Sequence, residues 1–160
     1  MLKVNIICVG RLKEKYWRDA CEEYSKRMRA FADFSIIEVD EEKLPDKPSD
    51  ANIGVTLEKE GKRILSRIPE GSAVFALCIE GREVDSPGLA HMIDRLPLNG
   101  YSAVSFIIGG SWGLSEEVKK AAKFRLSMSP MTFPHQLARV MLCEQLYRSF
   151  QISSGGKYHK

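Results

Sequence analysis

Three segments of the C-terminal half gather residue types that bind ligands or move protons. One is an apolar run that ends in three glycines, FIIGGSWGLS; the next, LSMSPMTFP, sets small hydroxyls, Met and Phe around two prolines. The third is the chain end, Lys-Tyr-His-Lys after Gly-Gly. Glycines allow close backbone approach and positive φ. Backbone groups of a stiff loop that cannot all pair internally remain available to a ligand.

Each of the two loops has a second interpretation. The spacing of Gly109, Gly110 and Gly113 is GGxxG, which matches neither the dinucleotide fingerprint nor the P-loop. On spacing alone, a tight turn before a helix is slightly favoured over a small-molecule pocket that binds no phosphate. The loop Ser129–Pro134 could read an adenine edge through main-chain bonds, or could be a rigid connector in which Phe133 packs against the following helix.

The charge of the chain is unevenly distributed. From Lys119 to Lys160 there are eight Lys/Arg and one acid, Glu144, whereas the first 118 residues hold sixteen basic and twenty acidic side chains. Such asymmetry points to a polyanionic partner. A solvated helical face is the alternative, and composition alone does not decide between them.

The segment Gln136–Ile152 is predicted to be a helix that is apolar most of the way round. A helix of this kind needs more burial than one sheet face provides, which suggests a subunit interface, although core burial is nearly as consistent. Arg139 and Arg148 are then phosphate or carboxylate partners, or form surface salt bridges with Glu144. The tail Ser153–Lys160 by itself is typical of a frayed terminus.

Elements alternate along the chain. Strands are predicted at Leu2–Val9, Phe34–Val39, Ala73–Ile79, Ala103–Ile108 and Phe124–Met128. Helices are predicted at Lys13–Phe31, at Ala51–Ile68 (with a weakening Gly61), from an N-cap at Ser86 to about Leu96, after an N-cap at Ser115, and at Gln136–Ile152. The alternation predicts an α/β fold, a mostly parallel sheet with helices on both faces. Ligands then bind at the carboxyl ends of the strands.

Length and composition indicate one domain in a reducing compartment. The chain has 160 residues, and its four cysteines have no CxxC or Cys/His ligand spacing, so we expect buried thiols and a cytoplasmic location. No apolar run approaches the roughly 20 residues of a membrane span. Neither HxxxH nor HExxH nor a carboxylate cluster suggests a metal, and His91 and His135 are interpreted as structural.

The combination of FIIGGSWGLS, LSMSPMTFPHQLARVMLCEQLYRSF and a Tyr-His terminus resembles the ribosomal RNA large subunit methyltransferase H family, and the N-terminal VGRLKEKYW fits as well. The resemblance covers residues 1–160 as a single SPOUT-class methyltransferase domain. It implies a Rossmann-like sheet with a C-terminal trefoil knot, the knot and cofactor site lying within about 73–152 and the basic tail at 153–160. The spacing arguments alone would predict an unknotted topology.

The resemblance also implies an activity and a site. S-adenosylmethionine would donate a methyl group to N3 of a pseudouridine in helix 69 of 23S rRNA, within the large subunit or the assembled ribosome. The implied cofactor contacts are Leu77, Gly109 and the loop of Met128, Ser129, Pro130, Met131, Thr132 and Phe133. No metal is implied. A SPOUT enzyme acting on tRNA and a non-catalytic ribosome-associated protein are the alternatives.

A sulfonium methyl donor reduces catalysis to in-line positioning of the base nitrogen, whose proton is taken by a general base or by solvent. The implied catalytic residues are Arg139 for a phosphate or the ionised base, Tyr158 for stacking, and His159 for orientation or proton removal. A homodimer would let one subunit's tail complete the pocket of its partner.

Overall fold

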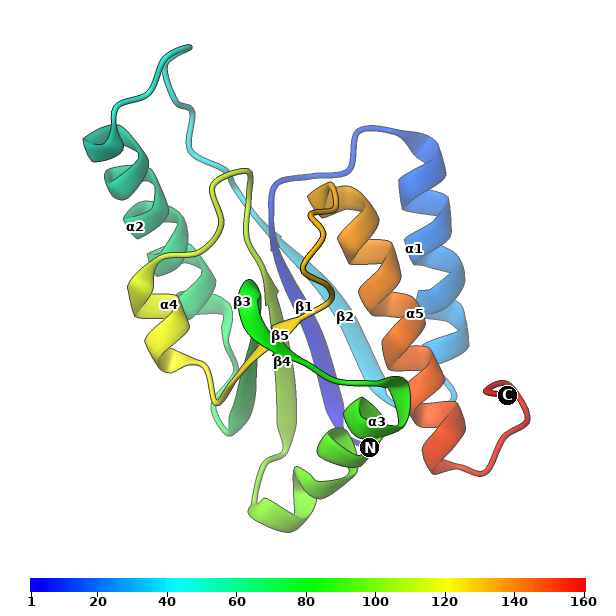
Figure 1. Cartoon of the computed structure of the whole chain (residues 1–160). Helices are drawn as coiled ribbons and strands as arrows, with labels where there is room; N and C mark the ends of the chain where they lie inside the picture. The colour runs from blue at the N-terminus through cyan, green and yellow to red at the C-terminus, as the bar shows by residue number, and fades with distance from the viewer.

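A computed structural model describes all 160 residues as one five-stranded sheet flanked by helices (Figure 1). The strands are β1 (Lys3–Val9), β2 (Asp33–Val39), β3 (Ser72–Glu83), β4 (Ala103–Ile108) and β5 (Phe124–Ser127). The helices are α1 (Lys15–Met28), α2 (Asp50–Arg67), α3 (Ser86–Arg95), the 3-10 turn η1 (Pro97–Asn99), α4 (Glu116–Ala121) and α5 (His135–Ser153). All neighbouring strands are parallel, in the order β2-β1-β4-β3-β5. The predicted parallel α/β sheet is therefore confirmed.

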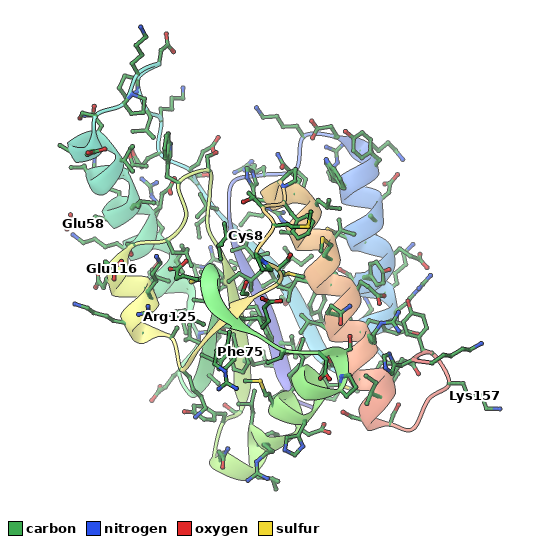
Figure 2. All side chains as sticks on the ribbon, in the orientation of Figure 1. Cys8, Glu58, Phe75, Glu116, Arg125 and Lys157 are labelled. Carbon is green, nitrogen blue, oxygen red and sulfur yellow. The ribbon has the colours of Figure 1, made fainter.

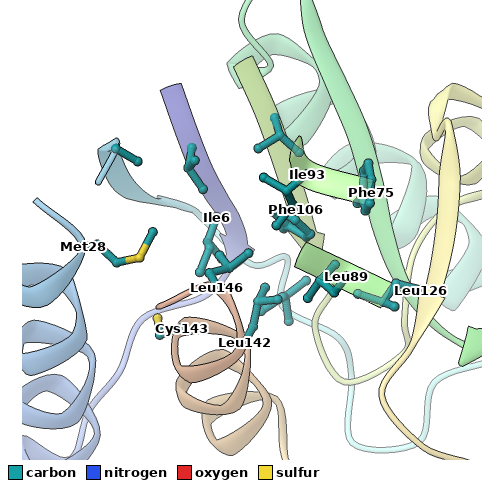
Figure 3. Packing of buried hydrophobic residues seen from close by; sticks show 14 of the residues in the cluster. Ile6, Met28, Phe75, Leu89, Ile93, Phe106, Leu126, Leu142, Cys143 and Leu146 are labelled. Atoms are coloured by element: carbon teal, nitrogen blue, oxygen red, sulfur yellow. The ribbon is translucent and has the colours of Figure 1, made fainter. Parts of the chain in front are cut away.

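Helices cover both faces of the sheet, so the central strands are apolar along their whole length. On one face α1, α3 and α5 enclose the larger core, in which Phe75 and Phe106 from β3 and β4 meet Leu142 and Leu146 from α5 (Figure 3). On the other face, α2 and α4 cover a smaller core around Ile64. The four cysteines are buried and unpaired, in line with the sequence. No helix is both long enough and apolar enough to cross a membrane.

Strand β3 is longer than its apolar run predicts. It pairs with β5 from Phe75 to Leu77, and after a register shift pairs with β5 again at Arg82 and Glu83. Between the two stretches its chain passes directly over β5, where a Cβ on Gly81 would lie 2.6 Å from the carbonyl oxygen of Arg125 (Figure 1). Only glycine permits so close a crossing. The polar end of β3 lacks the hydrophobic pattern that would have revealed it.

The helix starts follow capping chemistry. Ser115 accepts a hydrogen bond from the Val118 N–H and caps α4, as predicted. The predicted cap at Ser86 is wrong, because Asp85 takes that place and accepts from the Gly88 N–H at 2.7 Å. A carboxylate is the stronger acceptor, and the Ser86 hydroxyl instead donates to Gln145 on α5.

Candidate functional site

A cavity of about 520 Å³ opens at the carboxyl ends of β3, β4 and β5, and we call it the apolar cavity. Its size falls in the range of small-molecule sites. The middle of β3, the loop after β4, the loop after β5 and the first turn of α5 form its walls. They contribute Leu77, Cys78, Ile79, Ile108, Gly109, Gly110, Ser111, Gly113, Leu126, Met128, Ser129, Met131, Thr132, Phe133, Pro134, His135 and Ala138. None of these is an acid, a lysine or an arginine.

The loop after β4 is both a tight turn and a wall of this cavity. The Gly113 N–H donates to the Gly110 carbonyl at 3.1 Å, and Gly113 has φ of 87°, which favours glycine. A Cβ on Gly109 would lie 2.4 Å from the Gly113 carbonyl oxygen. The loop can close on itself only with a glycine at position 109. The motif is therefore a tight turn before a helix and also part of the wall of a small-molecule cavity.

The loop after β5 is braced by its own hydroxyls. The Ser127 hydroxyl donates to the Ser129 carbonyl at 3.2 Å, and the Ser129 hydroxyl accepts from the Met131 N–H at 3.0 Å. Met131 is 72% exposed, so its side chain is available to a bound molecule. Of the eight residues predicted to contact the cofactor, seven line the apolar cavity; Pro130 does not.

Arg139 is buried, contrary to the expectation of a boundary cation. Its guanidinium donates to Glu38 at 2.7 Å and to the Gly10 carbonyl at 3.2 Å, with 3% of its side chain exposed. The alternative of an ion pair with Glu144 is wrong for Arg139, because Glu144 pairs with Arg148 at 2.7 Å. Within one subunit the guanidinium thus has its hydrogen bonds directed at β2 and the loop after β1.

The tail folds back onto α5 instead of fraying. The Tyr158 hydroxyl donates to Glu144 at 2.7 Å, its ring packs edge-on against Tyr147, and the Arg148 guanidinium lies 4.6 Å from the ring centre. The hydrogen bond to Glu144 raises the pKa of Tyr158. His159 contacts Arg148 through Nδ1 at 3.1 Å.

The docked tail does not line the apolar cavity of its own subunit. That cavity reaches α5 at Ala138, whereas Tyr158 is held by Glu144 and by residues further along the helix. Glu144 comes six positions after Ala138 on the helix, a rise of about 9 Å. The three residues predicted to be catalytic are therefore not brought together in one chain.

His135 is a site residue that the sequence interpretation missed. It opens α5 and lines the apolar cavity, and it also lines a second cavity of about 700 Å³, which we call the charged cavity. The other residues of the charged cavity are Gly10, Arg11, Lys13, Glu14, Asp40, Glu41 and Gln136. In the sequence, His135 comes directly after Pro134 at a predicted helix start on the carboxyl edge of the sheet. That position could have marked it as a candidate site residue.

Fold and site together define a SPOUT methyltransferase, and the model of that family, described as a predicted SPOUT methyltransferase, matches residues 2–159. A probable methylase family protein from Haemophilus influenzae has the same fold, with a TM-score of 0.53 at 13% identity over 100% of this chain and 72% of the other.

Two full-length relatives narrow the family further. The chain is 49% identical over 160 residues to a ribosomal RNA large subunit methyltransferase H from Oenococcus oeni, covering 100% of both chains. It is 48% identical over 159 residues to the protein of that name from Streptococcus thermophilus, covering 99% of this chain and 100% of the other. The chain belongs to the ribosomal RNA large subunit methyltransferase H family.

Proposed function

We propose that this chain is an S-adenosylmethionine-dependent methyltransferase acting on N3 of a pseudouridine in helix 69 of 23S rRNA, on the large subunit or the assembled ribosome. The observation that carries this proposal is the apolar cavity, because seven residues that the family resemblance assigns to the cofactor converge there. Full-length identity of 49% to a ribosomal RNA large subunit methyltransferase H supports the RNA substrate.

The cavity fits the cofactor chemically. It is lined by apolar side chains and by the backbones of two loops, with no lysine or arginine to bind a phosphate. S-adenosylmethionine is a nucleoside without phosphate, and it supplies an activated methyl group when bound. Leu77 and Leu126, paired across β3 and β5, provide an apolar surface for an adenine ring. Loop residues from Met128 to Phe133 provide main-chain groups for its edge.

The remaining parts of the proposal concern the fold of the chain around this site and the second subunit of a homodimer. We place a trefoil knot at the crossing of β3 over β5, where Gly81 touches Arg125. We also propose a homodimer through α5, in which the tail of one subunit reaches the apolar cavity of the other. The docked position of Tyr158, away from its own cavity, supports a role in trans.

The catalytic roles follow from where the side chains lie. Tyr158 offers a ring face for stacking on a splayed base, His159 orients that base, and both arrive with cationic lysines at positions 157 and 160. Arg139 acts indirectly, because its hydrogen bonds to Glu38 and to the Gly10 carbonyl fix the start of α5 beside the cavity.

The decisive experiment is mass spectrometry of helix 69 from ribosomes incubated with the enzyme and isotopically labelled S-adenosylmethionine. We expect one labelled methyl group on the pseudouridine, at N3. Label on tRNA would instead identify the alternative SPOUT activity. Absence of cofactor binding in calorimetry would leave a non-catalytic RNA-binding protein.

A further inference from the structure

The imidazole of His135 lies on the wall between the two cavities at the carboxyl edge of the sheet. On one side is the apolar cavity, and on the other the charged cavity, which has no hydrophobic residue in its lining. His135 is half-buried, and no hydrogen bond to the protein holds its ring. A basic nitrogen is thus free at the boundary between a site for an apolar nucleoside and a polar recess.

The charged cavity has two cations, Arg11 and Lys13, that can bind a phosphate, and three carboxylates that can accept hydrogen bonds from the hydroxyls or N–H groups of a nucleotide. The loop after β1 contributes Arg11 and Lys13, both exposed, and the loop after β2 contributes Asp40 and Glu41. Lys13 has no carboxylate partner, and the Arg11–Asp40 pair is loose at 3.7 Å with both side chains 79% exposed. Such cations can exchange a weak surface pair for a phosphate at little cost.

The protonation state of His135 suits a proton acceptor. Burial lowers its pKa, the nearby Arg139 guanidinium lowers it further, and Glu41 opposes the shift. The other charged side chains around the charged cavity are Arg11, Lys13, Glu14 and Asp40. With its pKa below the usual value for histidine, the ring is neutral at physiological pH and can take a proton.

We propose that the charged cavity receives the target nucleotide and that His135 is the general base that accepts the proton of the nitrogen to be methylated. In this step the N3–H bond breaks and the proton moves to the free ring nitrogen of His135. The N3 electron pair forms the bond to the methyl carbon while the carbon–sulfur bond breaks, its electron pair remaining on sulfur. The proton then leaves His135 for solvent. This inference rests on the proposed function.

His159 is less suited to that proton transfer. It is exposed on the tail, and Nδ1 lies 3.1 Å from the Arg148 guanidinium, which donates to it and occupies its lone pair. A role in orienting the base remains compatible with this contact, whereas His135 is the one histidine that lines both cavities within its own subunit.

The first test is the pH dependence of single-turnover methylation of ribosomes by His135→Asn and His135→Gln. Loss of a general base should lower the rate at pH 7 by about 10²-fold or more. The wild-type rate should be flat with pH above the lowered pKa of His135 and fall below it. In the variants the rate should rise about tenfold per pH unit until N3 itself ionises, because the unassisted reaction needs the ionised base.

The matched control is His91→Asn, since His91 is exposed on α3 outside both cavities and should keep the wild-type rate and profile. Calorimetry with S-adenosylmethionine completes the set, and we expect its affinity to change less than threefold in the His135 variants. An unchanged rate, a reduced rate with the wild-type pH profile, or a rate loss matched by lost cofactor affinity would each overturn the assignment.

A second measurement does not depend on turnover. Pseudouridine 5′-monophosphate is titrated into the full-length protein while the ring signals of the three histidines are followed by NMR. We expect the His135 signals to move and those of His91 to stay. If no His135 signal moves at saturating nucleotide, the inference fails even if ribosomes are methylated. Movement of His135 in a protein that does not methylate ribosomes would instead refute the proposed substrate.

Discussion

The Arg139 guanidinium links three elements at the carboxyl edge of the sheet. It extends from α5 to Glu38 on β2 and to the Gly10 carbonyl, where the chain turns out of β1 with φ of 90°. A buried cation without its partner is far more costly than a surface one. The pair therefore fixes the loop after β1, which is one wall of the charged cavity, relative to the first turn of α5.

Replacing this arginine should be costly. We expect Arg139→Met to lower the free energy of unfolding by about 2 kcal/mol, because the Gly10 carbonyl and the Glu38 carboxylate, whose side chain is 37% exposed, lose their donor. Urea denaturation measures the change. Arg11→Met is the control, since its pair with Asp40 is exposed and its loss should cost less than about 1 kcal/mol. Equal effects of the two substitutions would contradict a buried clamp.

A buried carboxylate on α2 makes stability depend on pH. Glu60 is 6% exposed, and burial raises its pKa in the folded state, although the Glu42 N–H donates to it at 2.9 Å. An acid whose pKa is higher when folded takes up protons on folding, so it destabilises the fold above that pKa and ceases to do so as pH falls. Glu60→Gln keeps an acceptor for the Glu42 N–H and removes the charge.

We therefore expect Glu60→Gln to be more stable than the wild type at pH 8, with the difference shrinking as the pH falls towards 4.5. Urea unfolding across this range measures it. The exposed Glu58→Gln, two residues nearer the N-terminus of α2 and on a different side of the helix, should show no such pH-dependent gain. A variant that is less stable than the wild type at pH 8 would show that the charged form is favoured by its surroundings.

At the level of elements, the loop from Gly109 to Gly113 sets the shape of the cofactor site. Gly109→Val should force the loop open because its Cβ would meet the Gly113 carbonyl oxygen. We expect S-adenosylmethionine binding to be lost in calorimetry, with the circular dichroism spectrum retained. Gly54→Ala, at an open position of α2, should leave affinity unchanged and stabilise the helix by about 1 kcal/mol. Undiminished binding by Gly109→Val would place the cofactor elsewhere.

Most elements could be predicted because their sequences repeat with the period of a strand or a helix. The five strands and five α-helices fall within a few residues of the predicted ranges. Gly61, which weakens α2 as a helix former, is explained by packing: a Cβ there would lie 2.4 Å from the Ser115 hydroxyl of α4. The second half of β3 could not be predicted, since it is polar and is defined by its crossing of β5.

The two loops of the candidate site could be singled out from their own residues, and the individual cofactor contacts, Leu77 and Gly109 included, were predicted from the family resemblance. The loop after β5 is contiguous in sequence, so its own residues mark it as a possible ligand site, whereas the partner of Arg139 is Glu38, 101 residues away along the chain. Glu144 is near in sequence and of opposite charge, but it lies on the side of α5 that meets the tail and Arg148. The shared wall at His135 depends on where the loops after β1 and β2 pass, which no local pattern encodes.

At the scale of the whole molecule, the basic residues of the C-terminal region are split between two places. Arg125 lies on the edge strand β5, and Lys157 lies on the tail at the opposite side of the chain (Figure 2). Within one subunit these two basic residues therefore lie on different sides of the molecule. In a two-fold dimer, the tail of one subunit can lie near the edge strand and cavity of the other.

The dimer itself is the first test of this arrangement. Light scattering at micromolar concentration should give twice the 18.1 kDa of one chain. Leu137 and Met141 on α5 are only partly buried in the single chain and belong to the surface we expect to be covered. A stable 18.1 kDa species would exclude a tail acting in trans.

Mixed dimers can show directly whether the tail works on its own cavity or on that of the partner. One subunit carries Gly109→Val, which disables its cofactor site, and the other lacks Tyr158–Lys160; each homodimer should methylate ribosomes at least about 10²-fold more slowly than the wild type. In a mixed dimer, the intact tail of the first subunit meets the intact cavity of the second. Random assembly of equal amounts gives one working site in half of the dimers, so about a quarter of wild-type activity should return. Activity that stays at the level of the two parents, in dimers shown by two affinity tags to be mixed, would mean that the tail serves its own subunit.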